Sequence, residues 1–309
     1  MKFSTLSIFI NVLNLTSANP TPTVMWHGLG DYSSSFFSMG HIQKLIERNV
    51  KNVYVYSVCV PGNRQESCTR INDIFNGFIG NVKTQILQQC DIIRTDERLM
   101  TEQGFNLLGF SQGGLFSRAL VQLCPDLKIR NVISIGGPQN GVFGFPGCDT
   151  FNFDDPEARD SCEAIRVFLN NNAVYRPNVQ NYVVPAQYWH DAFNSTNYGD
   201  LSKFLAEVNQ VNSIDQTQVE ALSLIDNLVL TAFTKDQTII PWQSEWFGFY
   251  EDGQDRNVVP MNELPIFKNL GLDKLYSEGK LTYYSLESGH LSFSDSWFVQ
   301  NIVEPFLDN

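Results

Sequence analysis

The sequence predicts an α/β fold with a mostly parallel central sheet and an inserted, mainly helical cap. Two observations lead to this class. Short apolar runs alternate with helical stretches over residues 24–135, and such alternation is typical of a parallel sheet with helices on both faces. One of these runs leads into a glycine-flanked serine, GFSQG at residues 109–113, which a helical stretch follows.

The elements can be assigned in chain order from their hydrophobic patterns. Apolar runs of strand length are residues 24–27, 53–58, 105–110, 131–135, 228–233 and 281–286. Helical periodicity over residues 73–93 predicts one long helix, with Asp73 capping its start. The apolar face of this helix consists of Phe75, Phe78, Ile79, Val82, Ile86 and Cys90. Further helices are expected over residues 115–123 and 293–306, the last one covering the sheet.

The 309 residues are enough for one large α/β domain that carries an insertion. Between the fourth and fifth expected strands, the pattern changes to short helical pieces mixed with Pro, Asn and aromatic residues. The prediction is therefore an α/β core made of residues 19–140 and 227–309, with residues 141–226 as the cap.

The first 18 residues (1–18) have the features of a secretory signal peptide. Lys2 supplies a positive start, residues 3–15 a short apolar stretch and residues 16–18 a small-residue cleavage site. The apolar stretch is too short to span a membrane and is interrupted by two asparagines. The alternative is a buried N-terminal strand. We expect a soluble mature protein, lumenal or secreted, without a transmembrane segment.

Six cysteines, all outside the expected signal peptide, fit an oxidising compartment. None has the C-x-x-C spacing of a zinc site, so no metal is expected. Pairing between sequence neighbours is favoured, with other pairings, or six free thiols in a cytosolic protein, left open. The favoured pairs are Cys59–Cys68, Cys90–Cys124 and Cys148–Cys162. Asn194 begins an N-glycosylation sequon, which also fits secretion.

The net charge of −12 argues against a nucleic-acid partner, because such proteins need clustered positive charge and no run of Lys or Arg occurs here. Residues 28–30 would need a third glycine at position 33 to form a dinucleotide-binding turn, and this position holds Ser33. The sequence contains no P-loop and no H-E-x-x-H motif. No cofactor is therefore predicted.

Ser111 stands in the G-x-S-x-G pattern of the nucleophile elbow of α/β-hydrolases. In such an elbow, a sharp turn between a strand and a helix holds the serine in a strained backbone, and flanking glycines avoid a clash. The hydroxyl is thereby presented at the carboxyl end of the strand. The other interpretation is an ordinary glycine-rich loop, but the strand before and the helix after favour the elbow.

A serine nucleophile needs a histidine to accept its proton and an acid to orient that histidine. In α/β-hydrolases, the acid and then the histidine follow the serine along the chain. His290 follows the last expected strand and is predicted to be the base, whereas His190 lies in the cap and is expected to be structural. Asp236 follows the fifth strand and is predicted to be the acid. Asp226 precedes that strand and should lie at the opposite sheet edge.

Acyl transfer also requires N–H donors for the oxyanion that develops during the reaction. One donor is expected to be the backbone N–H of Gln112, the residue after the nucleophile. The second is expected from the loop after the first strand, where the backbone N–H of Leu29 is the candidate. His27, at the start of this loop, is expected to brace it rather than to react.

Several segments together resemble the palmitoyl-protein thioesterases, lysosomal enzymes that remove long-chain fatty acids from S-acylated cysteines. The segments span nearly the whole mature chain in the family's order: WHGLGD (26–31), GFSQGG (109–114), GVFG (141–144), YWHD (188–191), SEWFGFY (244–250) and GH (289–290). The sequence departs from the family at Leu29, where methionine is frequent, and at residues 32–33, which replace a cysteine pair of some members. Those members lack counterparts of Cys59 and Cys68.

The resemblance implies an α/β-hydrolase fold with Ser111, Asp236 and His290 as the catalytic triad and a cap that holds the acyl chain. It implies hydrolysis of palmitoyl groups from S-acylated proteins or peptides through an acyl-enzyme, with release of long-chain fatty acid. The expected location is the lysosome or the secretory route through the ER, and a monomer is expected. Candidates for lining the acyl groove are Phe143, Phe145, Val167, Phe168, Leu169, Tyr188, Trp189, Phe193 and Phe204.

Other functions remain compatible with these residues. A secreted lipase or carboxylic-ester hydrolase would use the same triad on oxygen esters. An acyl-CoA thioesterase would differ only in its groove and surface charge. An inactive hydrolase fold used for binding would be expected to lack a triad member, and all three are present.

Overall fold

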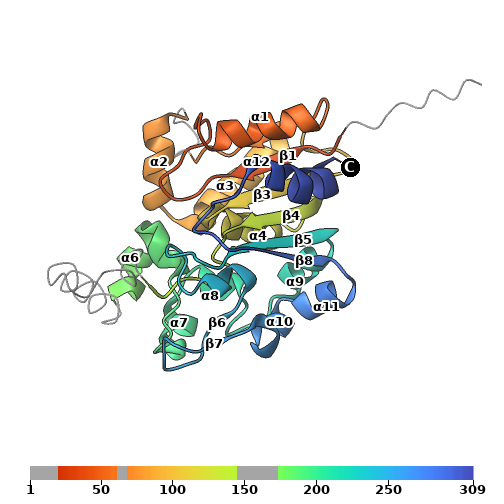
Figure 1. The fold of residues 1–309 in the computed structure, drawn as a ribbon. Coiled ribbons are helices and arrows are strands. Elements are labelled where there is room, and N and C mark those ends of the chain that lie inside the picture. Colours follow the sequence, from red (N-terminus) through yellow and green to blue (C-terminus); the bar gives the residue numbers. More distant parts are fainter. Residues whose placement is uncertain (1–19, 61–67, 145–172, 309) are drawn as a thin grey trace, which may run out of the picture.

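The computed structural model describes residues 20–60, 68–144 and 173–308. Its centre is a six-stranded parallel sheet with the order β2-β1-β3-β4-β5-β8 (Figure 1). The strands are β1 (Thr23–Trp26), β2 (Val55–Ser57), β3 (Phe105–Phe110), β4 (Ile129–Ile135), β5 (Asn227–Phe233) and β8 (Leu281–Leu286). The expected strands and the α/β class are confirmed, with strand ends shifted by a few residues.

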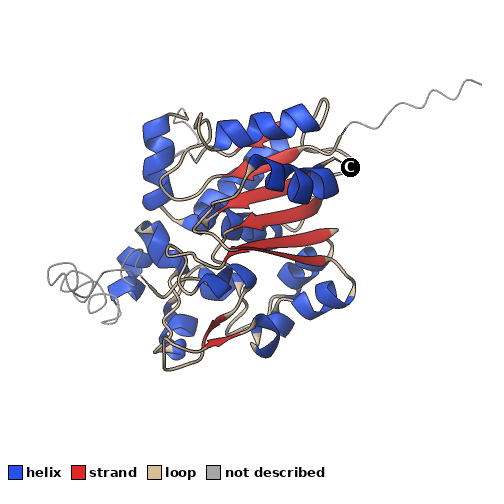
Figure 2. Cartoon of the chain, viewed as in Figure 1, coloured by secondary structure: helices blue, strands red, loops and turns tan. Residues whose placement is uncertain are grey.

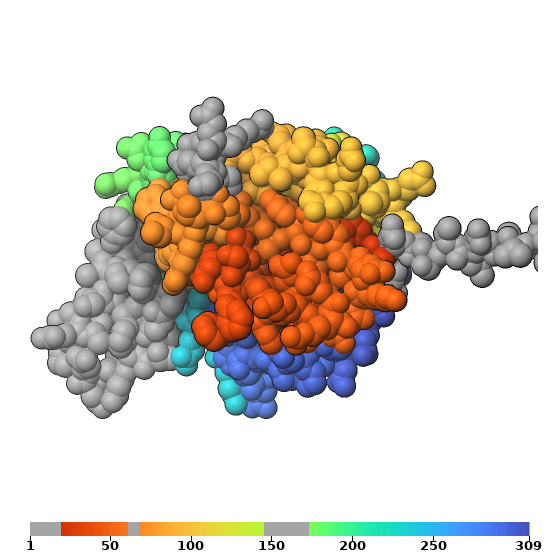
Figure 3. Space-filling model, turned by 90° about the horizontal axis from the view of Figure 1, so that it is seen from above, coloured from red at the N-terminus to blue at the C-terminus, as the bar shows by residue number. Residues whose placement is uncertain are grey.

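Both faces of the sheet are buried, as its nearly continuous apolar strands require. Neighbouring strand residues point to opposite faces, so Leu107 packs into one hydrophobic cluster and Leu108 into the other. The first face is covered by α3 (Val82–Thr95), α4 (Gln112–Leu123) and α9 (Gln216–Ser223). The second face is covered by α1 (Met39–Asn49) and by α12 (Asp295–Phe298) with its π-helical continuation, Val299–Leu307. Figure 3 shows the orange N-terminal part lying against the blue C-terminal part.

The prediction of a single helix over residues 73–93 is wrong, because two helices, α2 (Arg70–Phe78) and α3, occupy this stretch. Gly80 between them has a φ of +143°, a conformation that favours glycine. The side chain of Asn81 then caps α3 by accepting from the Thr84 N–H at 2.9 Å. The apolar periodicity continues across the break, which is why the sequence pattern did not reveal it.

The break also changes which side chains face the core. Phe75 and Phe78 are exposed on α2, whereas Val82 and Ile86 are buried under α3. The cap of α2 is Thr69, which accepts from the Asn72 N–H at 3.2 Å, so the expected capping role of Asp73 is also wrong. Asp73 is instead fully buried and bonds to His27 in the loop that follows β1.

Two long connections, one from β4 to β5 and one from β5 to β8, lie next to each other. Most of their residues are below the sheet in the view of Figure 2. Between β4 and β5 stand η1 (Ala173–Tyr175), α6 (Pro177–Tyr182), η2 (Val184–Tyr188), α7 (Ser195–Leu201), α8 (Leu205–Val208) and α9. Between β5 and β8 stand η3 (Trp242–Trp246), β6 (Phe249–Tyr250), β7 (Val258–Val259), η4 (Met261–Glu263), α10 (Ile266–Asn269) and α11 (Leu272–Ser277). The division of the chain into core and cap at residues 140 and 227 stays a prediction.

Two of the favoured disulfides are present, Cys59–Cys68 and Cys90–Cys124. The second one joins α3 to the residue that follows α4, and both of its cysteines are fully buried in the core. Cys148 and Cys162 lie outside the described residues, so their pairing stays a prediction.

The expected signal peptide (1–18) also lies outside the described residues. Within the described ranges, no helix combines the length and hydropathy needed to cross a membrane. Asn194, the expected glycan site, is exposed at the start of α7, which it caps by accepting from the Asn197 N–H at 3.0 Å. Its glycosylation stays a prediction.

Candidate active site

The serine segment forms a tight turn between β3 and α4. Ser111 has a φ of 52° and a ψ of −130°, a conformation that non-glycine residues rarely adopt. A Cβ atom on Gly109 would collide with the backbone of Gly113, and one on Gly113 would collide with the carbonyl oxygen of Trp26. The two glycines therefore permit the turn that presents the Ser111 hydroxyl.

The structure brings Ser111, Asp236 and His290 together at the carboxyl ends of β3, β5 and β8. The Ser111 hydroxyl donates to His290 Nε2 across 2.9 Å, although 179 residues separate the two in sequence. The Nδ1–H of His290 donates to Asp236 Oδ2. Because a carboxylate only accepts, this bond leaves Nε2 free to accept a proton from the serine. The geometry is that of a triad, and the catalytic roles stay a prediction.

Asp236 is held rigidly behind the histidine. Its side chain has no exposed surface, and its Oδ1 accepts from the N–H groups of Thr238 at 2.7 Å and Ile239 at 3.1 Å. Burial raises the pKa of Asp236, but its hydrogen bonds, first among them the one from His290, hold the pKa below its ordinary value. Asp236 is therefore charged and oriented at neutral pH.

His190 and Asp226, the other residues considered for the base and the acid, lie away from Ser111. The ring of His190 stacks between those of Tyr198 and Phe249, with centroids 3.7 Å from each, and its Nδ1–H donates to the Asn140 carbonyl at 2.8 Å. Burial lowers the pKa of His190 to about 3, so the ring is neutral. Asp226 stands at the opposite end of β5. There it accepts from Arg130 Nε at 2.9 Å, as its position before the strand predicts.

An apolar cavity of about 460 Å³ opens beside Ser111 and His290. It lies between the loop that precedes α1 and the segment between β8 and α12. Its apolar walls include Leu29, Phe37, Met39, Ile42, Leu291 and Phe293. None of these six residues is among the residues predicted to line the acyl groove.

The cap residues expected to line the acyl groove have mixed positions. Tyr188, Trp189 and Phe204 are buried in the hydrophobic core, and Phe193 is half exposed. Phe143 is partly buried and packs against Trp189. The other candidates, Phe145, Val167, Phe168 and Leu169, lie outside the described residues. The acyl groove in the cap stays a prediction.

The loop after β1 passes directly against the elbow. A Cβ atom on Gly28 would lie 3.0 Å from Ser111 Cβ, so only glycine allows this approach without displacement. Leu29 follows and lines the cavity. On the other side, the Gln112 side chain donates to the Gly77 carbonyl at 3.3 Å, which ties the start of α4 to α2. Both expected oxyanion residues therefore lie beside Ser111, and their roles stay predictions.

His27 braces this loop, as the sequence predicts. Its Nδ1–H donates to the Gly28 carbonyl and its Nε2–H donates to Asp73 Oδ1, both at 2.9 Å. Asp73 also accepts from the N–H groups of Ser33 at 2.7 Å and Val60 at 2.9 Å. Both ring nitrogens of His27 face acceptors, so the ring carries two protons and a positive charge.

This buried pair fixes the direction of the Leu29 N–H. In a trans peptide, the carbonyl of one residue and the N–H of the next point in opposite directions. The bond from His27 to the Gly28 carbonyl therefore holds the Leu29 N–H in one direction. Sequence reasoning missed Asp73, since its spacing resembled that of a helix cap and its partners lie far away in the chain.

The charges of His27 and Asp73 make the stability of the folded protein depend on pH. Burial lowers the pKa of His27, but the hydrogen bond and charge of Asp73 raise it above its ordinary value of 6.5. Burial raises the pKa of Asp73, but His27 and the backbone N–H groups lower it below its ordinary value. His27 therefore contributes fully to the free energy of unfolding below about pH 6.5, and this contribution is lost as the pH rises through its folded-state pKa. That of Asp73 is complete above about pH 4 and is lost as the pH falls through its folded-state pKa.

Replacing Asp73 by asparagine is expected to lower the free energy of unfolding by about 3–5 kcal/mol, because it leaves a buried imidazolium without its partner. Urea unfolding of both proteins across pH measures this difference, which should be largest near pH 5 and smaller on both sides. Asp295→Asn is a matched control: it removes the partner of His41 in an exposed pair, with side chains 43% and 60% exposed. This change should cost less than about 1 kcal/mol. A difference for Asp73→Asn that does not vary with pH would contradict the ionic pair.

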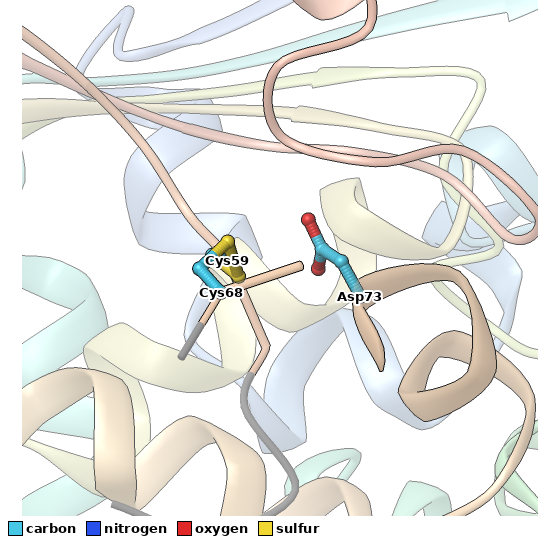
Figure 4. Close-up of side chains that lie close together, drawn as sticks. All are labelled: Cys59, Cys68 and Asp73. Carbon is cyan, nitrogen blue, oxygen red and sulfur yellow. A yellow bond between two sulfur atoms is a disulfide. The ribbon is translucent and has the colours of Figure 1, made fainter. Parts of the chain in front are cut away.

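Two groups of potential metal ligands occur among the described residues, and neither suits a metal. Cys59, Cys68 and Asp73 lie close together (Figure 4), but the two sulfurs form a disulfide, and metals bind thiolates. Asp236, Glu245 and His290 form the other group, in which His290 Nδ1 is already bonded to Asp236. Glu245 is a second carboxyl group beside Asp236, and sequence reasoning did not assign it to the site.

A parallel sheet that delivers a serine on a strand-to-helix turn, an acid and a histidine to one edge is the arrangement of the α/β-hydrolases. The protein is thus a hydrolase of this fold class. Comparison with known families narrows the class. The model of the palmitoyl protein thioesterase family matches residues 22–290, and the chain belongs to this family.

Relatives from distant organisms agree with this assignment. Palmitoyl-protein thioesterase 1 of Caenorhabditis elegans is 37% identical over 93% of this chain and 91% of its own length. Palmitoyl-protein thioesterase 3 of Dictyostelium discoideum is 29% identical over 93% of this chain and 90% of its own. Lysosomal thioesterase PPT2 of Homo sapiens is 29% identical over 66% of both. The family resemblance seen in the motifs is confirmed.

Proposed function

We propose that this protein hydrolyses thioesters between long-chain fatty acids and protein cysteines, with Ser111 as the nucleophile. The observation that carries the proposal is the 2.9 Å contact between His290 Nε2 and Ser111 Oγ, which stands at the wall of an apolar cavity. Membership of the palmitoyl protein thioesterase family supports palmitate as the acyl group.

In the proposed reaction, Ser111 attacks the thioester carbonyl while His290 Nε2 takes its proton. Asp236 stabilises the imidazolium that forms. The backbone N–H groups of Leu29 and Gln112 donate to the oxyanion of the tetrahedral intermediate. Expulsion of the thiolate, which receives the proton from His290, leaves palmitate bound to Ser111 as an ester. The thiolate leaves readily because the pKa of a cysteine thiol is about 8.5.

The acyl-enzyme is then hydrolysed by the same groups. A water molecule gives a proton to His290 and attacks the ester carbonyl. The oxyanion again accepts from Leu29 and Gln112, and the proton returns to Ser111 as the fatty acid leaves. The mechanism needs no cofactor.

Labelling with a fluorophosphonate, followed by peptide mapping, tests the nucleophile, and Ser111 is the residue expected to be modified. The substrate class is tested by comparing kcat/KM for a palmitoyl-cysteinyl peptide, palmitoyl-CoA and the matching palmitoyl-seryl peptide. We expect the cysteinyl peptide to be the best substrate. Faster turnover of the oxygen ester would assign the protein to the lipases and ester hydrolases, and preference for the CoA thioester would make it an acyl-CoA thioesterase.

The apolar walls predict a preference for long chains. Each methylene buried in the cavity contributes about 0.8 kcal/mol, or roughly a fourfold gain in kcat/KM. A series of thioesters with acyl chains of increasing length on one thiol measures this gain, which should continue until the groove is filled. A constant kcat/KM along the series would show that the chain stays outside the protein.

The remaining predictions belong to this proposal. Residues 1–18 direct the chain into the ER, and the lysosome is the proposed destination, supported by the name of the human relative. The two disulfides support an oxidising compartment. We further propose a glycan on Asn194, a third disulfide between Cys148 and Cys162, a monomer, and a cap at residues 141–226 that completes the acyl groove.

A further inference from the structure

Glu245 is a buried carboxyl group whose two oxygens have different surroundings. It lies on η3, and its side chain has no exposed surface. Oε2 accepts from the Phe233 N–H at 2.7 Å, at the end of β5. Oε1 is also buried, and none of the described residues donates a hydrogen bond to it. It lies 4.0 Å from His290 Nδ1, and the ligand atoms of Glu245, Asp236 and His290 are all within 4.8 Å of one another.

Two carboxylates this close in the buried interior repel each other, and a single imidazole cannot neutralise both. Burial and the neighbouring Asp236 raise the pKa of Glu245 well above its ordinary value, whereas the pKa of Asp236 is lowered. Lys235, the residue before Asp236, forms an exposed pair with Glu287 at 3.1 Å. Glu245 is therefore the neutral member, and its proton belongs on Oε1, because Oε2 accepts from the Phe233 N–H.

We propose that Glu245 is a positioning residue, a neutral carboxylic acid that donates a hydrogen bond to Asp236 and holds it as the acceptor for His290 Nδ1–H. The inference rests on the proposed triad. A protonated Glu245 explains why Oε1 is buried although no group in the described part of the chain donates a hydrogen bond to it. The Oε1–H group is itself the donor. It also adds to the surroundings of Asp236, whose Oδ1 is held by backbone N–H groups.

Three variants separate this role from that of a charge or of a space-filling side chain. Glutamine at position 245 has the same shape as the neutral acid: its carbonyl can accept from the Phe233 N–H and its NH2 group can donate to Asp236. Alanine removes both bonds. Aspartate keeps the carboxylic acid, but its side chain is one methylene shorter, so the acid lies farther from Asp236. The set is therefore Glu245→Gln, Glu245→Ala and Glu245→Asp.

The measurements are kcat and KM on the palmitoyl thioester, the rate of fluorophosphonate labelling at Ser111 and the pH profile of kcat/KM. Glu245→Gln is expected to stay within about threefold of the wild-type kcat, with an unchanged acid limb of the profile, because a neutral donor replaces a neutral donor. Glu245→Ala and Glu245→Asp are expected to lose about 10- to 100-fold in kcat and in labelling rate, with little change in KM.

Several results would overturn the proposal. If Glu245→Gln is as slow as Glu245→Ala, or if its acid limb moves to lower pH, then Glu245 is ionised in the wild type. Full activity of Glu245→Ala would show that the bond has no effect on the triad. Thermal unfolding checks that each variant folds, and the glutamine variant decides the matter if alanine does not fold. A wild type that is not labelled at Ser111 would instead refute the proposed function itself.

Discussion

Replacing Ser111 by alanine is expected to lower kcat for thioester hydrolysis by at least about 10⁴-fold, because the acyl-enzyme can no longer form. The Oγ that is lost is the atom 2.9 Å from His290 Nε2. Fluorophosphonate labelling should disappear in the same variant. The measurement is single-turnover kinetics with a palmitoyl thioester, at enzyme concentrations high enough to detect the residual rate.

Ser117→Ala provides the matched control for Ser111→Ala. Ser117 lies in α4, the helix that directly follows Ser111. It is fully buried, and its hydroxyl has no hydrogen-bond partner among the residues that the structure describes. Removing an unpaired hydroxyl should leave both kcat and the unfolding temperature nearly unchanged. Near wild-type turnover in Ser111→Ala, with labelling at another residue, would refute the assignment of the nucleophile.

Asp236→Asn is expected to lower kcat by about 10³- to 10⁴-fold. Asparagine can still accept from the N–H groups of Thr238 and Ile239, but it then turns its NH2 group towards His290. His290 Nδ1 must then accept, which places the ring proton on Nε2, where it faces Ser111. The imidazole in this tautomer cannot take the serine proton. The kcat of the purified variant, measured across pH, tests this expectation.

Asp226→Asn is the corresponding control, since it changes an aspartate at the other end of the same strand. Asp226 is half exposed, accepts from Arg130 and lies far from the cavity residues. We expect unchanged kcat and a loss of stability below about 1 kcal/mol. Equal losses of activity in Asp236→Asn and Asp226→Asn would indicate a general effect on the fold rather than a loss of the acid.

The strands were predictable because their apolar runs are short, distinct and buried on both faces. The helices were less predictable from the sequence. The periodicity of residues 73–93 continues through Gly80, so the pattern suggested one helix where the chain forms two. Hydrophobic spacing reports which residues could share a face, but it does not report a break between two helices that both carry apolar side chains.

The meeting of Ser111, Asp236 and His290 at one sheet edge was predictable for a chemical reason. A serine elbow has a local pattern, and parallel strands place their carboxyl ends at one edge, so the loops after β5 and β8 were the expected positions of the predicted acid and base. With only two histidines after Ser111, the choice was small. The same reasoning correctly separated Asp236 from Asp226, since they stand at opposite ends of β5.

The sequence by itself determined the parallel sheet, the family and the three side chains at the sheet edge, because each depends on a local pattern or on strand order. Only the tertiary structure decided which buried charges face each other: His27 with Asp73, and Glu245 with Asp236 and His290. These pairings depend on how loops far apart in the chain pack together. The protonation of each group follows from that packing, since burial and the nearest charge set its pKa.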